Sequence, residues 1–259
     1  MTVNFYKYQG TGNDFILIDN RQLKLTLDQS RIAELCHRKL GIGADGLMLL
    51  DESDLSDFRM VYYNSDGKGS SMCGNGGRCI SHFAKFLGIV KQKGIFDAID
   101  GFHDFSIDES GIVKLKMNNV EHITKDEQAF VMDTGSPHYV KQIEDIDKLD
   151  VVNLAREIRY NDIYREKGIN VNFVECVDQD IFMRTYERGV EDETLSCGTG
   201  TVAVALSLVF NGMKSKSPVM INTPGGKLNV HFKKNKAGFS DIWLEGPAKM
   251  VFSGTIEIN

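Results

Sequence analysis

CGNGGRCISHFAKFLG, residues 73–88, and CGTGTVAVALSLVFNG, residues 197–212, are two versions of one segment. Placed at an offset of 124 residues, they share a cysteine, three glycines and a phenylalanine. The coinciding pairs are Cys73/Cys197, Gly74/Gly198, Gly76/Gly200, Phe86/Phe210 and Gly88/Gly212, and Gly101 coincides with Gly225 beyond them. A repeat of this length indicates a duplicated domain. The alternative is that glycine-rich helix starts resemble one another by chance.

Each version predicts a helix that begins just after its cysteine. In the first, Ile80, Phe83, Ala84 and Leu87 follow the spacing of one helix face, and Gly88 ends the helix. The second contains TVAVALSLVF, residues 201–210, which is apolar on nearly all sides and should therefore be buried all round. A central helix wrapped by strands satisfies that requirement.

The flanking sequence predicts strands and two further helices. One helix is expected over residues 28–40, with Ile32, Leu35, Cys36 and Leu40 on its apolar face, and another over 151–158. Runs of β-branched and aromatic residues predict strands at residues 15–18, 112–117, 171–177, 181–186, 219–221 and 228–232. We expect two domains, 1–118 and 119–248, with the tail 249–259 belonging to the first.

The composition limits the class of protein. The 259 residues are 42% hydrophobic and 25% charged, which is ordinary for a globular chain. The net charge is −6, so the chain lacks the excess of Lys and Arg that is typical of nucleic-acid-binding proteins, and we expect no nucleic-acid partner. No run approaches the roughly 20 apolar residues of a membrane helix, and the first residues lack a signal-peptide pattern. An odd count of five cysteines does not indicate a disulfide framework, so we expect a cytoplasmic protein.

The two glycine-flanked cysteines are the strongest chemical signal. A helix N-terminus presents free N–H groups and partial positive charge, which hold an anion and favour a nearby thiolate. Two such sites facing each other across a cleft suit the transfer of a proton from one face of a carbon to the other. One thiolate removes the α-proton, the opposite thiol returns a proton, and the N–H groups stabilise the charge on the substrate carboxylate.

Other interpretations of these cysteines stay open. In the simplest alternative, Cys73 and Cys197 only pack in the core. In a second, they form a disulfide that senses redox state. In a third, the protein binds an amino acid at this site without catalysing a reaction. Cys36 and Cys176 are expected to pack in the core, and Cys79, one and a half helical turns beyond Cys73, is expected to point away from Cys73. The sequence lacks paired metal-ligand spacings, so no metal site is expected. The GIGADG motif, residues 41–46, has a helix before it and a strand after it, the reverse of a dinucleotide fingerprint, and is expected to be a turn that leads into a strand.

Taken together, the motifs resemble the diaminopimelate epimerases over nearly the whole chain. The similar stretches are GTGNDFILIDNR (10–21), GIGADGL (41–47), YNSDG (63–67), MCGNGGRC (72–79), GSPHYV (135–140), YERGVEDETLSCGTGTVA (186–203) and TPGGKL (223–228). Proline racemases share the two cysteine motifs in outline, so a racemase of the same fold with another substrate is the alternative.

This resemblance implies a fold, a reaction and a set of residues. The fold is α/β, with two pseudo-symmetric domains, each a curled mixed β-sheet around a central helix, and an active site in the interdomain cleft. The reaction interconverts LL- and meso-diaminopimelate without a cofactor or metal, in a homodimer. Cys73 and Cys197 match the catalytic cysteines, with His138 assisting the first and Glu187 the second. The positions that match substrate-binding residues are Asn13, Asn64, Gly74, Asn75, Asn170, Glu187, Arg188, Gly198 and Thr199.

Individually, several of these residues have ordinary explanations. Arg188 and Glu187 suit surface ion pairs, and Asn13 and Asn64 suit turns. The chain also departs from the family pattern: Ser136 replaces a common Asn, Gly46 replaces the Gln of some members, and the stretch from Glu187 to Cys197 is one residue longer than in many members. These departures affect the expected substrate contacts, and the catalytic groups are all retained.

Overall fold

A computed structural model describes residues 1–70 and 72–258 of the chain. The chain forms two compact units: Met1–Leu115 together with the residues from Gly246 onward, and Lys116–Glu245. The domain limits expected from the sequence stay a prediction. Across the described residues, no helix has the length and apolar character needed to cross a membrane.

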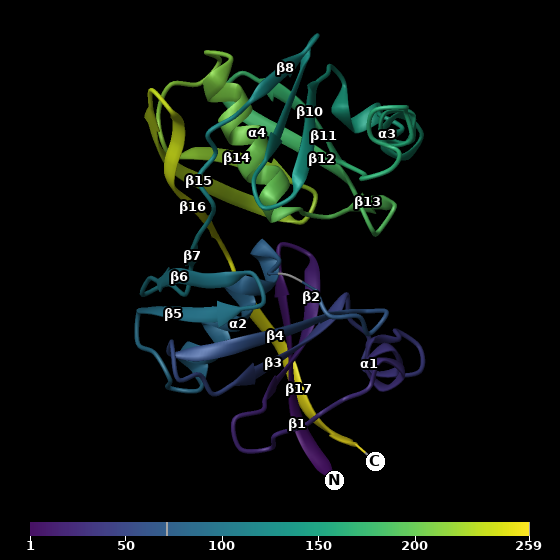
Figure 1. The fold of residues 1–259 in the computed structure, drawn as a ribbon, viewed down its shortest axis with the longest axis vertical. Helices are drawn as coiled ribbons and strands as arrows, with labels where there is room; N and C mark the ends of the chain where they lie inside the picture. The colour runs from purple at the N-terminus through teal and green to yellow at the C-terminus, as the bar shows by residue number, and fades with distance from the viewer. Residues whose placement is uncertain (71, 259) are drawn as a thin grey trace. The chain divides into compact units, whose positions relative to one another are not determined.

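The first unit is a mixed sheet with one helix on each side (Figure 1). Its strands follow the order β17–β1–β2–β3–β4–β5–β6–β7, in which β2 and β3 are parallel and β4 and β5 are parallel. Its elements are β1 (Thr2–Gly10), β2 (Asn13–Asp19), α1 (Gln29–Cys36), β3 (Gly46–Asp51), β4 (Phe58–Asn64), α2 (Gly74–Phe86), β5 (Lys93–Ala98), β6 (Gly101–Ile107), β7 (Val113–Lys116) and β17 (Lys249–Glu257).

The second unit has the same architecture. Its strands follow the order β8–β9–β10–β11–β12–β14–β15–β16, with β10 parallel to β11, β12 parallel to β14, and β13 paired with β12. Its elements are β8 (Thr124–Asp126), β9 (Ala129–Asp133), β10 (Pro137–Gln142), the 3₁₀ turn η1 (Ile146–Lys148), α3 (Val151–Arg159), β11 (Asn170–Val177), β12 (Asp180–Glu187), β13 (Asp192–Thr194), α4 (Gly198–Phe210), β14 (Val219–Thr223), β15 (Gly226–Asn235) and β16 (Gly238–Gly246).

The two units repeat one topology. In each, a parallel strand pair flanks an outer helix, α1 or α3, and a second parallel pair flanks the central helix, α2 or α4. At one edge of each sheet, the outermost strand, β17 or β8, pairs antiparallel with its neighbour, β1 or β9. The predicted α/β class with two pseudo-symmetric halves is therefore confirmed.

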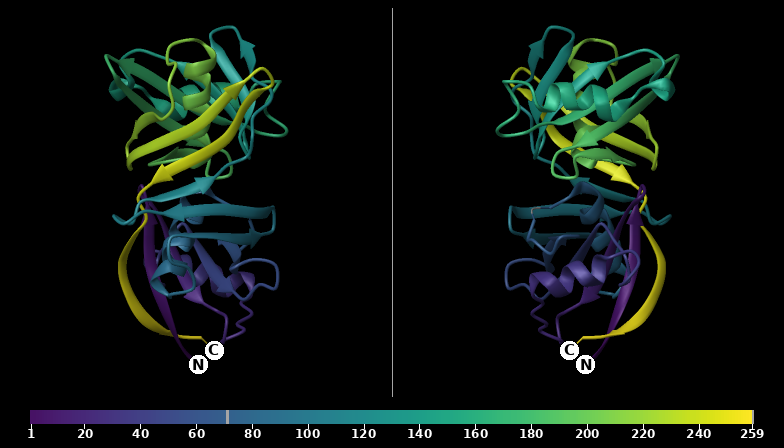
Figure 2. Two further views of the ribbon diagram at one scale, coloured as in Figure 1. Left: turned by 90° about the vertical axis from the view of Figure 1, so that its left-hand side faces the viewer. Right: turned by 90° about the vertical axis from the view of Figure 1, so that its right-hand side faces the viewer.

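The central helices have the character that the sequence predicts. Residues from Gly200 to Val209 of α4 are buried on all sides, and strands surround the helix (Figures 1 and 2). Gly88 and Gly212 adopt positive φ angles of 74° and 79° just after the two helices. In each case the next residue donates its N–H to a carbonyl of the last helical turn, Ile89 to Ala84 at 3.0 Å and Met213 to Leu208 at 2.9 Å. Both helices thus end in a Schellman motif, which requires a residue that tolerates positive φ.

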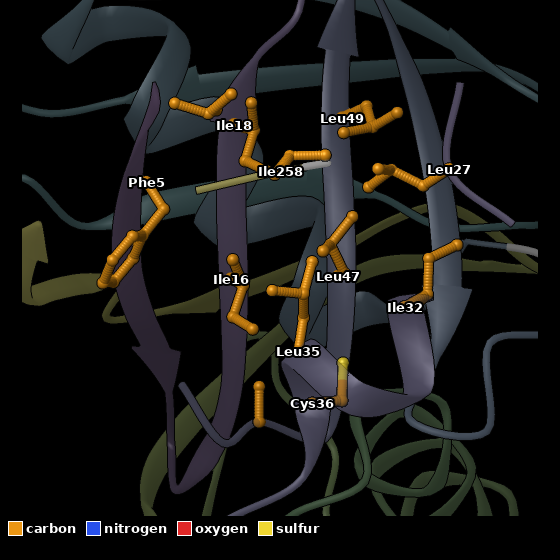
Figure 3. Close-up of a cluster of buried hydrophobic side chains, with 12 residues drawn as sticks. Phe5, Ile16, Ile18, Leu27, Ile32, Leu35, Cys36, Leu47, Leu49 and Ile258 are labelled. Carbon is orange, nitrogen blue, oxygen red and sulfur yellow. The ribbon is translucent and has the colours of Figure 1, made fainter. Parts of the chain in front are cut away.

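The outer helix α1 covers one face of the first sheet. Its Ile32, Leu35 and Cys36 pack on a buried cluster contributed by β1, β2 and β3 (Figure 3). The helix ends at Cys36, so the predicted extent to residue 40 is wrong, and Leu40 is 77% exposed. The carbonyl of Leu35 accepts from Ile42 and Gly43 at 2.9 and 3.0 Å, which turns the chain toward β3. The GIGADG segment is therefore a turn that leads into a strand, as predicted.

Candidate active site

Cys73 is the N-cap residue of α2 in the first unit. Its half-buried thiol donates to Asn13 Oδ1 at 3.6 Å, and Asn75 Nδ2 donates to the same oxygen at 3.4 Å. The orientation of the Asn13 amide is set by its nitrogen, because Nδ2 donates to Asp45 Oδ2 at 2.7 Å. Because a carboxylate only accepts, the Asn13 carbonyl oxygen must face Cys73. Three residues predicted for this site are therefore in direct contact.

A buried arginine lies behind this helix start. The Arg78 guanidinium is fully buried and donates to Asn75 Oδ1 at 3.0 Å, Thr11 Oγ1 at 3.1 Å and the Gly74 carbonyl at 3.2 Å. Burial lowers the Arg78 pKa to about 10, which leaves the group charged at neutral pH. Its charge adds to the positive end of the helix, so this site favours an anion.

Cys197 is the N-cap residue of α4 in the second unit. The residue is buried, and its Sγ lies 3.5 Å from the Thr199 hydroxyl. Gly198 and Thr199 form the first turn of the helix, so their backbone N–H groups are among those without helical partners. The site in this unit is again a thiol at a helix N-terminus, with a hydroxyl beside it.

His138 belongs to the same group of residues. Its Nε2 lies 2.9 Å from Thr199 Oγ1, and its Nδ1 lies 3.1 Å from Asn172 Nδ2. Burial, and secondarily the charge of Arg188, lowers the His138 pKa to about 3. The imidazole is therefore neutral at physiological pH. Through Thr199 it is connected to Cys197 within its own unit, and its predicted action on Cys73 stays a prediction.

Glu187, Arg188 and Asn170 form a second group beside β12. Asn170 Oδ1 accepts from the Arg188 backbone N–H at 2.8 Å, and its Nδ2 donates to the Pro137 carbonyl at 3.2 Å. Glu187 Oε2 accepts from the Thr194 hydroxyl at 3.0 Å. Arg188 is exposed, and its Nη1 donates to the Lys167 carbonyl at 3.1 Å. The buried Asn170 amide thus fixes the backbone that presents Arg188 to solvent.

Asn64 and Gly46 lie opposite each other in the first sheet. Asn64 ends β4 with an exposed side chain and is paired with Gly46, the first residue of β3. A Cβ at Gly46 would lie 2.6 Å from the Tyr62 ring and 2.6 Å from the Tyr63 carbonyl oxygen. A side chain at this position therefore requires Tyr62 to move, which is why glycine suits this chain.

Two of the three remaining cysteines, Cys36 and Cys79, are buried core residues. Burial raises the pKa of Cys36 to about 11 and that of Cys79 to about 12, so both stay protonated. Cys176 is half-buried on β11, and burial raises its pKa as well. Within residues 1–70 and 72–258, no group of three or more His, Cys, Asp or Glu side chains is placed to hold a metal ion.

Comparison with known proteins identifies the relatives of the chain. The sequence model of the family described as diaminopimelate epimerase matches residues 5–123 and 130–251. A diaminopimelate epimerase of Flavobacterium psychrophilum is 50% identical over 256 residues, which cover 98% of this chain and 100% of that protein. A diaminopimelate epimerase of Chlorobaculum tepidum is 42% identical, with 96% and 99% covered.

Solved structures share the fold at low sequence identity. A phenazine biosynthesis protein of the PhzF family from Bacillus anthracis superposes with a TM-score of 0.78 at 14% identity, covering 100% of both chains. A hydroxyproline epimerase from Agrobacterium vitis superposes with a TM-score of 0.69 at 12% identity, covering 98% of this chain and 92% of that one. At these identities the likeness concerns the fold alone.

Proposed function

Because this chain belongs to the diaminopimelate epimerase family, we propose that it interconverts LL-2,6-diaminopimelate and meso-diaminopimelate without a cofactor. The substrate is a small molecule, and its product is a precursor of lysine and peptidoglycan. We also propose a cytoplasmic location, from the cysteine count and the sequence patterns described above, and a homodimer, on the family resemblance alone.

In the proposed mechanism, Cys73 and Cys197 act as the two bases. One thiolate removes the α-proton while the other thiol donates a proton to the opposite face, and the roles exchange in the reverse direction. The observation that carries this proposal is the equivalence of the two cysteines, each the N-cap of the central helix of its unit. Backbone N–H groups of the first turn of each helix stabilise the negative charge that spreads onto the reacting carboxylate.

The other predicted residues receive roles that suit their surroundings. Gly74, Asn75, Gly198 and Thr199 supply the N–H groups at the two helix starts. Arg188 is exposed and suited to pair with the far carboxylate of the substrate. Asn13, Asn64, Asn170 and Glu187 are assigned by family position to bind its amino groups and far carboxylate. By the family resemblance, His138 assists Cys73, as a hydrogen-bonding group that is neutral in the free protein, and Glu187 assists Cys197.

Proton exchange in deuterated water tests this function. Reduced wild-type protein is incubated with LL-diaminopimelate, and NMR follows loss of the α-proton signal together with formation of the meso isomer. We expect exchange with inversion in wild type and in Cys176→Ser, which changes a thiol that the mechanism does not use. Exchange with inversion should disappear in Cys73→Ser and in Cys197→Ser. Undiminished epimerisation in either of these two variants would contradict the two-thiol mechanism.

A further inference from the structure

Asn172 is the third residue of β11 and is fully buried beside Gly200, in the first turn of α4 after Cys197. Its Nδ2 donates to the Tyr139 carbonyl at 3.1 Å and lies 3.1 Å from His138 Nδ1, and its Oδ1 accepts from the Thr185 hydroxyl at 3.0 Å. Because a backbone carbonyl only accepts, the amide nitrogen must be on the side of Tyr139 and His138. The second N–H of that nitrogen is therefore directed at His138 Nδ1.

This orientation decides the tautomer of a neutral His138. A donor facing Nδ1 needs a lone pair there, so the imidazole proton resides on Nε2. The Nε2–H then donates to Thr199 Oγ1 at 2.9 Å, and the Thr199 hydroxyl hydrogen is left to face Cys197 Sγ at 3.5 Å. The hydrogen bonds run in one direction, from Asn172 through His138 and Thr199 to the sulfur, and they favour a thiolate as the final acceptor.

The first unit shows that the fold does not require this polar pair. The parallel pair β2/β3 aligns Phe15 with Gly46, and the equivalent pair β10/β11 aligns His138 with Asn170. Phe15 therefore occupies the place of His138, and Met48, two residues into β3, occupies the place of Asn172. A Cβ added at Gly76 would meet Met48 and Phe15, and one added at Gly200 would meet Asn172. At the same position against the central helix, one unit has an apolar pair and the other a His–Asn pair.

We propose that Asn172 is a positioning residue of the epimerase site, which in the substrate-free protein holds His138 as the Nε2–H tautomer so that Thr199 directs its hydroxyl hydrogen at Cys197. This role rests on the proposed function, because it deepens the assignment of Cys197 as one of the two bases. The substrate class is unchanged, and Asn172 contacts the reacting atoms only through His138 and Thr199.

The test determines directly which ring nitrogen of His138 is protonated. ¹⁵N NMR of the imidazole nitrogens is recorded on the full-length reduced protein without substrate, and the His138 signals are identified by their absence in His138→Gln. The variant is Asn172→Asp, whose carboxylate only accepts and so draws the imidazole proton to Nδ1. The matched control is Asn222→Asp on β14, where the amide donates to the Ile181 carbonyl at 3.0 Å.

We expect a protonated Nε2 and a bare Nδ1 in wild type and in Asn222→Asp, and a protonated Nδ1 in Asn172→Asp. The kcat/KM for diaminopimelate should fall by at least about tenfold in Asn172→Asp alone, since a histidine locked in the wrong tautomer loses its function. An unchanged tautomer in Asn172→Asp, or an equal loss of kcat/KM in Asn222→Asp, overturns the proposal.

The wild-type spectrum alone tests the proposed tautomer of His138, even if Asn172→Asp fails to fold. A proton on Nδ1 of wild-type His138 overturns the proposal without any variant. The spectrum is also independent of the reaction, because it is recorded on the free protein. Failure of the proposed function would show instead as absence of α-proton exchange in wild type, whatever tautomer His138 adopts.

Discussion

The buried imidazole of His138 gives the fold a pH dependence that follows from its surroundings. Burial lowers its pKa from 6.5 to about 3, so the folded protein keeps this group neutral where the unfolded chain protonates it. Between these two pKa values the unfolded state binds more protons, and stability therefore falls as pH falls below about 6.5. The slope from one such group is about 1.4 kcal/mol per pH unit.

Urea unfolding of wild type and His138→Gln at about pH 7.5 and about pH 5.5 measures this contribution. The wild type should lose about 1 kcal/mol more than the variant over that interval, because only the wild type has this histidine to protonate. Equal losses in the two proteins would mean that His138 is already charged, or already accessible to protons, in the folded state.

Arg188 carries a second prediction at the scale of one residue. Its exposed guanidinium bonds a single backbone carbonyl in the described structure, so most of its donors face solvent and suit a carboxylate. Arg188→Ala should raise the KM for diaminopimelate by about ten- to a hundredfold, from the loss of about 1.5–3 kcal/mol in a charge-assisted contact. The thermal midpoint should change little.

The control for Arg188→Ala is Arg165→Ala, an exposed arginine whose ion pair to Asp162 measures 3.0 Å and which has no predicted substrate role. Steady-state kinetics on both variants separate loss of a substrate contact from loss of surface charge. An unchanged KM in Arg188→Ala would assign the far carboxylate to another group.

At the scale of elements, the two helix starts offer a matched comparison. A Cβ at Gly76 of α2 collides with the terminal methyl of Met48, the flexible end of a long side chain. A Cβ at Gly200 of α4 collides instead with the Asn172 oxygen, which is held by the buried network around His138. The same substitution therefore displaces an adaptable apolar group in one unit and a fixed polar group in the other.

We expect Gly76→Ala to stay within about 1 kcal/mol of wild type, because a gain in helix propensity offsets part of the repacking. Gly200→Ala should lose at least about 2 kcal/mol, since it leaves buried donors and acceptors without partners. Chemical denaturation of both variants measures the difference. Equal free energies of unfolding would show that the Asn172 network adapts as readily as Met48.

The sequence predicted the four α-helices and the strands β2, β7, β11, β12, β14 and β15, because their signals are local, and it left most of the other strands unpredicted. The all-apolar stretch of α4, the glycines that end α2 and α4, and the strand runs depend on nearest neighbours and burial. Helix α1 was predicted too long because its end is set by backbone hydrogen bonds from Ile42 and Gly43 to Leu35, which periodicity does not contain. Side-chain patterns therefore predict which face of a helix is buried more accurately than they predict the residue at which the helix ends.

Asn172 and Arg78 were missed for a different reason. Asn172 lies between Val171 and Phe173 in a strand that is buried on both faces. The sequence pattern therefore predicts a core position there, and a polar residue in that position carries no further local signal. Arg78 reads as an ordinary charged residue of a helix, although it is fully buried. The repeat contained a usable signal, since the offset of 124 residues places Met48 on Asn172 and Val202 on Arg78. A polar residue at the place of an apolar one marks a position that packing alone does not explain.

At the scale of the whole molecule, the last strand completes the first unit. β17 pairs antiparallel with β1 from Thr2↔Glu257 to Gln9↔Lys249, so the two ends of the chain lie side by side (Figure 2). Ile258 is buried in the cluster of Figure 3, and Ile256 packs against it. The first unit can therefore complete its fold only after the second unit has been synthesised.

Removal of the residues after Ala248 should destabilise the first unit by at least about 3 kcal/mol, from lost ladder hydrogen bonds and lost burial of Ile258. Hydrogen exchange measured by mass spectrometry should show faster exchange in β1 and β2 while α4 stays protected, because α4 packs within the second unit. The control is a circular permutant that joins the native ends and opens the exposed turn between Lys236 and Ala237. It retains β17 and should exchange like wild type. Equal loss of protection in α4 and β1 on truncation would mean that the two units unfold as one cooperative body.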